Sequence, residues 1–158
     1  GTAPKVQYGL GVYLKWKGVD LGMFFNGSAK RTILQSPMNP FGADTGSEWG
    51  AGERQLAKYI DQQRWTEANP DPNAKYPRLG TLYTDVRNNL ETSTYWLRDG
   101  SFIRFKTLEF GYTFPFCRLY FSADNLAVWS PFKLWDPELS WNSFPLQRTF
   151  NIGLQFHF

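Results

Sequence analysis

Arg148-Thr-Phe-Asn-Ile-Gly-Leu-Gln-Phe-His-Phe158, the last eleven residues of the sequence, alternate between apolar and polar side chains. Every second residue from Phe150 to Phe158 is apolar, and the residues between them are small or polar. A period of two indicates a β-strand with one apolar and one polar face. Strands of transmembrane barrels are about ten residues long and alternate in this way, with the apolar side toward lipid. The pattern therefore favours a strand whose apolar face contacts lipid.

The composition is compatible with such strands. Aromatic residues make up 18% of the 158 residues, yet the mean hydropathy is only −0.45. Strands with one polar face, joined by long solvent-exposed loops, explain why a high aromatic content and a low mean hydropathy occur together. No apolar run approaches the roughly 18 residues that a membrane helix needs, which excludes a helical membrane protein.

Charge and cysteine content exclude several other classes of protein. The formal net charge is +3, and the 17 Lys and Arg residues are scattered among 14 Asp and Glu residues, so nucleic-acid binding is not predicted. The single cysteine, Cys117, excludes an internal disulfide and a cysteine-based zinc cluster. The sequence contains no Gly-x-Ser-x-Gly motif and no P-loop, and we predict no catalytic residue, no metal site and no enzyme activity.

The same period of two recurs along the chain. It predicts five antiparallel strands over residues 5–17, 19–29, 101–114, 118–128 and 148–158. Each has one apolar face, which we expect to contact lipid. The residues predicted to face lipid are Val6, Tyr8, Leu10, Val12, Leu14, Trp16, Leu21, Met23, Leu108, Phe110, Tyr112, Leu119, Phe121, Phe150, Ile152, Leu154 and Phe156.

The connections between these strands alternate in length. Short turns lie near residues 17–20 and 114–117, whereas long excursions cover about 30–100 and 129–146. In an up-and-down sheet both short turns fall on one side, as in outer-membrane barrels, which have short periplasmic turns and long extracellular loops. We therefore predict an all-β, antiparallel, up-and-down segment of a transmembrane β-barrel with long extracellular loops.

Two local features interrupt the alternation. Helical spacing within residues 53–65 predicts one short amphipathic helix in the first long loop. Near residues 102–106 the alternation loosens, because Arg104 and Lys106 would share the apolar face. We interpret this stretch as the point where the strand leaves the membrane.

Five strands are too few to close a membrane barrel, which needs about eight or more. Open edges in lipid would leave backbone groups without hydrogen bonds. We therefore expect residues 1–158 to be the C-terminal portion of a barrel domain, with further strands upstream of this chain.

Several stretches in order resemble the C-terminal end of the SusC-like family of TonB-dependent outer-membrane transporters of Bacteroidetes. They are Tyr95–Pro115, Leu119–Leu126, Trp135–Glu138 and Phe144–Gly153, together with Arg64–Asn69 followed by Tyr76–Arg78. The resemblance covers nearly the whole chain. The turn Pro115–Arg118 is shorter than the connection that relatives often have at this place.

The resemblance implies a barrel of about 22 strands filled by an N-terminal plug, of which this chain would supply the last five strands. It implies import across the bacterial outer membrane of oligosaccharides, or of peptides, together with a SusD-like surface lipoprotein. It also implies energy from the TonB complex through an N-terminal region absent here. The terminal Phe158 looks like the aromatic end that the barrel-assembly machinery recognises.

Aromatic side chains in the predicted loops are candidates for substrate binding. Our candidates are Trp65, Tyr83, Trp96 and Trp135, whose rings could stack on sugars or contact peptides, although loop packing explains such rings equally well. Loop acids, namely Asp44, Glu48, Asp61, Asp71, Asp85 and Asp99, match no calcium-binding spacing, so calcium is not indicated and no cofactor is expected. Glu109 and Asp124 should point into the barrel lumen.

Two other functions fit parts of the pattern. A soluble β-sandwich that binds carbohydrate through surface tryptophans would bury the apolar faces between two sheets. A receptor or adhesin barrel without transport would share the strands but lack a plug and a TonB-contacting segment.

Overall fold

The computed structural model describes residues 3–35, 58–78, 88, 91–139 and 143–157. The chain forms two compact units. The first consists of residues 1–33 and 98–158, and the second of residues 34–97.

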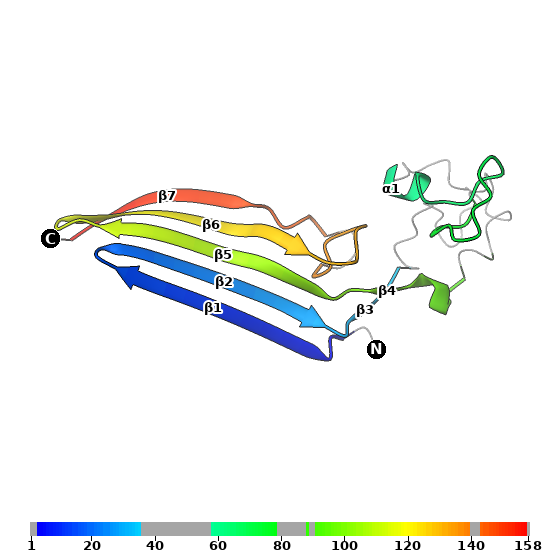
Figure 1. Ribbon diagram of the computed structural model, residues 1–158, viewed down its shortest axis with the longest axis horizontal. Coiled ribbons are helices and arrows are strands. Elements are labelled where there is room, and N and C mark those ends of the chain that lie inside the picture. Colours follow the sequence, from blue (N-terminus) through cyan, green and yellow to red (C-terminus); the bar gives the residue numbers. More distant parts are fainter. Residues whose placement is uncertain (1–2, 36–57, 79–87, 89–90, 140–142, 158) are drawn as a thin grey trace. The chain divides into compact units, whose positions relative to one another are not determined.

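The first unit is a five-stranded antiparallel sheet, shown in Figure 1. Its strands lie in the order β1-β2-β5-β6-β7, which is also their order along the chain. They are β1 (Val6–Trp16), β2 (Val19–Ala29), β5 (Phe102–Thr113), β6 (Cys117–Trp129) and β7 (Thr149–Phe156). The five strands predicted from the sequence are confirmed, with ends that agree within two residues. Barrel closure and the number of strands in a barrel stay predictions.

Tight turns join β1 to β2 and β5 to β6. Lys17 and Gly18 both have positive φ, 46° and 86°, as the two central residues of a type I′ turn require. This turn matches the right-handed twist of the strands and places Trp16 opposite Val19. At the second turn the N–H of Phe114 donates to the carbonyl of Cys117 at 2.7 Å. Strand β7 ends on the same side, because Phe156 pairs with Cys117.

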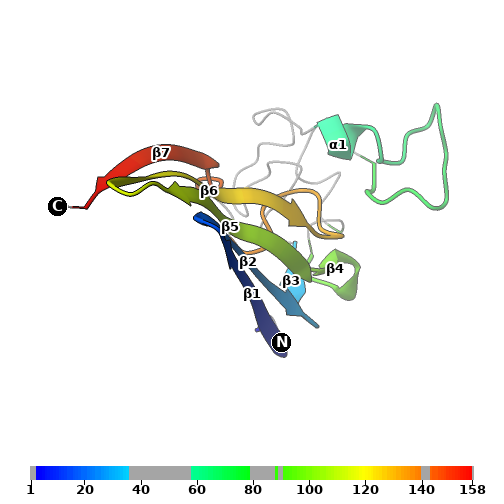
Figure 2. The same ribbon diagram turned by 60° about the vertical axis from the view of Figure 1, so that its left-hand side comes forward.

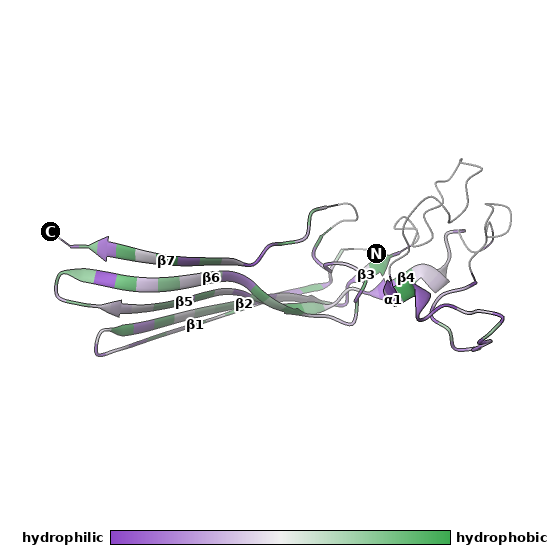
Figure 3. Cartoon of the chain, turned by 90° about the horizontal axis from the view of Figure 1, so that it is seen from above, coloured by the Kyte–Doolittle hydropathy of each residue, from purple (hydrophilic) through white to green (hydrophobic). Residues whose placement is uncertain are grey.

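The register places all the predicted lipid-facing residues on one face of the sheet. Leu14 lies opposite Leu21, which lies opposite Phe110, and the row continues through Phe121 to Ile152. Rings on this face contact one another, as in the pair Phe121 and Phe150, whose centroids are 6.2 Å apart. Figure 3 shows apolar and polar segments alternating along β6 and β7. That this apolar face contacts lipid stays a prediction.

The expectation that Arg104 shares the apolar face is wrong, whereas the point at which β5 leaves the membrane stays a prediction. Phe24 pairs with Thr107 whereas the next residue of β2, Phe25, pairs with Phe105, so Lys106 is an extra residue in a β-bulge. The bulge shifts the alternation by one position. Phe105 therefore joins the apolar face, where it stacks on Phe25 at 4.5 Å between centroids, and Arg104 lies on the polar face.

The sheet twists strongly between its two halves. In Figure 2 strands β1 and β2 run at a steep angle to β6 and β7. Bulges increase local twist, and the register shifts at the same level between β5 and β6, where Asn125 has a φ of +54°.

The second unit has little regular structure. The helix expected over residues 53–65 is one turn in the described part, α1 (Lys58–Asp61), and residues 53–57 lie outside the described residues. A 3-10 turn, η3 (Thr94–Trp96), follows later in the chain. Ile60, Tyr76 and Trp96 form the buried core of this unit. Among the described residues no helix is long and apolar enough to span a membrane.

A two-stranded sheet of β3 (Thr32–Leu34) and β4 (Leu97–Asp99) was not predicted. Strands of three residues are too short for a period of two to be recognised. The carbonyl of Arg31 accepts a hydrogen bond from the N–H of Gly100 at 2.9 Å, which extends this pairing by one step.

Gly27 of β2 tests how tightly the sheet is packed. A Cβ at this position would overlap the carbonyl oxygen of Phe102 and the ring of Tyr8, whose hydroxyl donates to that carbonyl at 2.8 Å. We expect Gly27→Ala to lower the free energy of unfolding by about 1 to 3 kcal/mol, the usual cost of overpacking. Thermal unfolding of the purified full-length protein measures the effect.

Gly11→Ala on the neighbouring strand is the matched control. A Cβ there would meet only the ring of Phe24, at an ordinary contact distance of 3.8 Å. Equal melting temperatures for the two variants would contradict the packing described here.

Candidate functional site

The polar face of the sheet carries an ion cluster centred on Arg118. Its guanidinium donates to both carboxylate oxygens of Asp20 and, at 2.6 Å, to Glu109. Asp20 is buried, whereas Glu109 is 45% exposed. Gly111 lies between these residues, and a Cβ there would come within 2.7 Å of the guanidinium. The absence of a side chain at this position lets Arg118 reach across β5 to Asp20.

A shallow hollow of about 360 Å³ lies on the same face, next to Glu109. The rings of Tyr13 and Phe24 lie beside Gly11 and Gly22 in its lining. Both rings are exposed although they occupy polar-face positions. The sequence prediction missed this hollow, because the alternation assigned these rings to a face otherwise made of polar residues.

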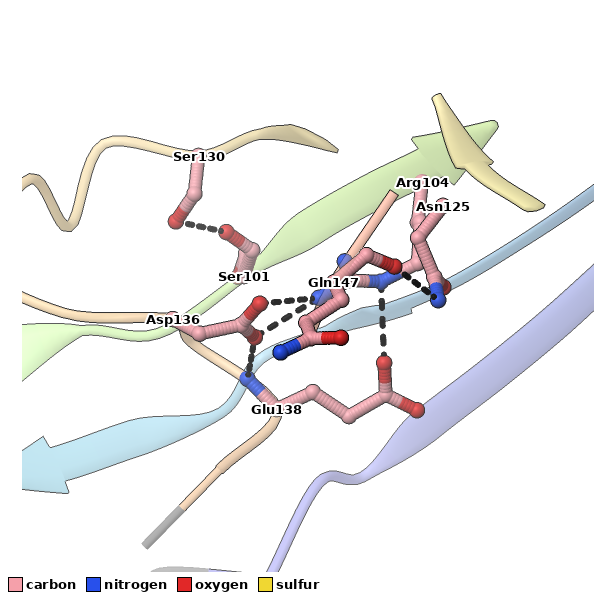
Figure 4. Close-up of polar contacts among 7 residues, drawn as sticks. All are labelled: Ser101, Arg104, Asn125, Ser130, Asp136, Glu138 and Gln147. Carbon is pink, nitrogen blue, oxygen red and sulfur yellow. Dashed lines mark hydrogen bonds and ion pairs between the residues drawn. The ribbon is translucent and has the colours of Figure 1, made fainter. Parts of the chain in front are cut away.

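The end of β5 near Phe102 holds a second ion cluster, shown in Figure 4. Arg104 Nη2 donates to both oxygens of Asp136, at 2.6 and 2.7 Å, and Arg104 Nε donates to Glu138 at 3.0 Å. Asp136 also accepts the N–H of Glu138 at 2.9 Å. The two acids belong to the segment that follows β6. Arg104 is only 2% exposed, so its charge is compensated almost entirely within the protein.

The loop acids considered for calcium have structural partners where they are described. Asp71 accepts the N–H of Asn73 at 2.8 Å, and Asp99 accepts the N–H of Ser101 at 2.9 Å. The Ser101 side chain and this N–H hold the pKa of the Asp99 carboxyl below its usual value. Within the described ranges no group of three or more His, Cys, Asp or Glu residues could hold a metal ion. Asp44, Glu48 and Asp85 lie outside them.

The second unit contains a hollow of about 590 Å³. Backbone hydrogen bonds from Trp65 N to Tyr76 O at 2.9 Å and from Tyr76 N to Gln63 O at 3.2 Å build one wall. Tyr95 builds another, because its hydroxyl donates to the carbonyl of Lys75 at 2.7 Å. Polar side chains complete the lining. The residues lining the hollow are Trp65, Asp71, Pro72, Ala74, Tyr76, Pro77, Arg78, Asn88, Ser93, Tyr95 and Trp96.

This hollow brings together two of the four predicted substrate-binding residues. Trp65 is half-buried and Trp96 almost wholly buried, so Trp65 presents more ring surface. Trp135 belongs to the other unit, in the segment after β6, and Tyr83 lies outside the described residues. The prediction did not single out Tyr95 or Arg78, although Arg78 ends the stretch Tyr76–Arg78 that carried part of the family resemblance.

Comparisons with known proteins agree with the predicted class. No family model matches the chain. Two curated proteins of Formosa agariphila, TonB-dependent receptor P26 and TonB-dependent receptor P3, are each 26% identical to it over 181 aligned residues. The alignments cover 98% of this chain but only 17% and 16% of the two receptors, so the chain spans about a sixth of the length of these relatives.

Solved structures with a similar fold include two of the RagAB peptide importer. The chain matches the open-open state with a TM-score of 0.71 at 23% identity, and the closed-closed state with a TM-score of 0.72 at 24% identity. These matches cover 99% and 98% of this chain and 17% of the importer chain in each case. The resemblance found in the sequence is thereby confirmed, and the relatives are receptors and importers rather than enzymes.

Replacing Arg118 tests the ion cluster of the polar face. Arg118→Met would leave the buried carboxylate of Asp20 without its partner, so we expect a loss of about 1 to 3 kcal/mol in the free energy of unfolding. This is less than for a fully buried pair, because Arg118 retains some contact with water. The double variant Asp20→Asn/Arg118→Met should recover part of the loss. Chemical denaturation of the purified full-length protein checks both values, and equal losses would contradict the coupling.

Proposed function

We propose that this chain, a piece of a SusC-like TonB-dependent transporter of the bacterial outer membrane, forms five consecutive wall strands of a barrel that imports large solutes. The observation that carries the proposal is the sheet with two unlike faces. One face is apolar across all five strands, exposed on β1 and β7 and half-buried on β2, and the other carries ion pairs and polar side chains.

The dimensions of the sheet fit a lipid bilayer. Strands β1 and β2 have eleven residues each. At about 3.3 Å per residue such a strand is roughly 36 Å long. Tilted by about 45°, it rises roughly 25 Å, the height of the apolar band of an outer-membrane barrel. Strands β1 and β7 each pair on one side only among the described strands, which supports further strands in the longer protein.

The alternative of a soluble carbohydrate-binding sandwich is not favoured. It requires a second sheet over the apolar face, yet within the described residues that face remains open, with Ile152 79% exposed and Leu10 61% exposed. The relatives with matching sequence are TonB-dependent receptors, which also favours the membrane protein.

Substrate and partners follow from the resemblance and from the hollow of the second unit. Oligosaccharides are the first candidates, because Trp65 and Tyr95 offer ring faces beside hydrogen-bonding side chains. Peptides are the second, supported by the likeness in fold to a peptide importer. A SusD-like lipoprotein would cover the extracellular side, and an N-terminal plug outside this chain would contact the TonB complex.

Replacing Leu154 by arginine tests the lipid-facing face. Leu154 lies near the short-turn end of β7, in the register row of Leu119 and Tyr112, and is 59% exposed. Arginine on the lipid face costs about 2 to 4 kcal/mol at the bilayer midplane and about 0 to 1 kcal/mol near the interfaces, so Leu154→Arg, which lies between these levels, should reduce the amount of folded barrel in the outer membrane and its heat stability. Heat-modifiable gel migration of membrane fractions measures both.

The next residue in sequence supplies the matched control. Gln155 belongs to the polar face, where it pairs with Arg118, so Gln155→Arg keeps the added charge out of lipid. If both variants assembled as well as the parent protein, the proposed orientation of the sheet would be wrong.

Replacing Trp65 by alanine tests the hollow as a substrate site. Loss of one stacking ring should raise the half-saturating substrate concentration about three- to tenfold, equivalent to about 0.7 to 1.4 kcal/mol. Uptake of labelled oligosaccharide and peptide mixtures by intact cells measures it. Trp129→Ala, on the apolar face, is the control and should leave this concentration unchanged. An unchanged value for Trp65→Ala would remove the hollow from the transport route.

A further inference from the structure

The segment 130–139, which follows β6, is held by strong contacts that the proposed function does not use. The sequence analysis assigned it to a long extracellular loop, residues 129–146. The structure shows where this segment is attached and on which face of the sheet.

Arg104 fixes the face on which the segment lies. The bulge at Lys106 places Arg104 on the polar face, opposite Asn26 of β2 and Val128 of β6. Because Asp136 and Glu138 bind this side chain directly, the part of the segment that contains them lies over the polar face. In a barrel whose apolar face contacts lipid, the polar face lines the lumen.

Further hydrogen bonds attach the start of the segment and the stretch that returns to β7, as Figure 4 shows. Ser130 Oγ donates to the carbonyl of Ser101 at 2.8 Å and accepts the N–H of Phe132 at 3.1 Å. On the return toward β7, Asn125 Nδ2 donates to the carbonyl of Gln147 at 3.0 Å. The segment is therefore attached through Ser130 and through Asp136 and Glu138, and the chain is attached again at Gln147.

Burial makes the central attachment hard to release. Arg104 is 2% exposed, and Phe132 and Pro137 of the segment are buried with it. If the segment lifted off, the guanidinium would lose both carboxylates, and an unpaired charge in a buried site is costly. The guanidinium adds specificity, because Nη2 binds Asp136 while Nε binds Glu138, and the single nitrogen of a lysine cannot present donors at both positions.

We infer that Arg104 is a positioning residue that holds residues 130–139 inward, as a fixed inner rim of the barrel mouth that cargo must pass. This inference rests on the proposed function, which makes the polar face the lumen wall. We call the contacts of Arg104 with Asp136 and Glu138 the clamp. The rim carries exposed Lys133 and half-buried Trp135, so the clamp also positions Trp135, the candidate substrate-binding residue of this unit. The inward position removes this segment from the surface available to a covering lipoprotein.

Limited proteolysis tests the clamp. Trypsin cleaves after Lys133 only when the segment opens locally, so the rate reports the open population. With full-length protein in detergent micelles, we expect slow cleavage in the parent protein. Arg104→Gln should be cleaved at least about tenfold faster, and Arg104→Lys, which keeps the charge but not the fork, should fall between them.

Arg148→Gln is the matched control, since Arg148 is an exposed arginine at the same end of the sheet. It should be cleaved after Lys133 as slowly as the parent protein. Asp136→Asn removes the negative charge that Arg104 binds, and this variant replaces Arg104→Gln in the test if Arg104→Gln fails to fold. Fast cleavage of the parent protein, or parental rates in both Arg104→Gln and Asp136→Asn, would overturn the inference.

The fold of each variant is checked separately by heat-modifiable gel migration. Loss of the folded band shows that the barrel has not assembled. A folded band with unchanged cleavage shows that the clamp does not hold the segment. Failure of the proposed function would appear instead as equal assembly of Leu154→Arg and Gln155→Arg, whatever the proteolysis shows.

Discussion

One constraint governs this sheet: the apolar face has to stay on the same side across five strands. Because the side-chain period of a strand is two, a single unpaired residue moves every later side chain to the opposite face. The bulge at Lys106 keeps Phe105 beside Phe25 on the apolar face while Leu108 remains beside Met23. If β5 paired with β2 without a bulge, Lys106 and Arg104 would fall on the apolar face.

The bulge also creates the chemistry at the end of β5. By turning Arg104 to the polar face, it gives the acids of the segment after β6 a buried cation to bind. A device that preserves the alternation thus also fixes the path of a connecting segment. At the opposite end of the sheet, Arg118 joins three strands by binding Asp20 of β2 and Glu109 of β5. The polar face therefore has one ion cluster near each end of the sheet.

The sequence was sufficient to predict the strands, because regular alternation over ten or more residues is a strong signal and Lys17-Gly18 has a recognisable turn chemistry. It was insufficient at residues 102–106, where a bulge and a strand end produce the same loss of alternation. The partners of Arg104 lie more than thirty residues away, and no local pattern specifies such a pairing. For the same reason Trp65 and Trp96 could be listed as candidates but not assigned to one hollow.

Glycines opposite rings are a recurring feature of the sheet. Tyr120 lies over Gly153 and Tyr8 lies over Gly27, each pair on adjacent strands. A bulky residue in place of the glycine would collide with the ring, and a small residue in place of the ring would uncover bare backbone. The two members of a pair are therefore free to vary only in concert, so related chains should show correlated exchanges at these cross-strand positions and retain the glycine wherever the ring is kept.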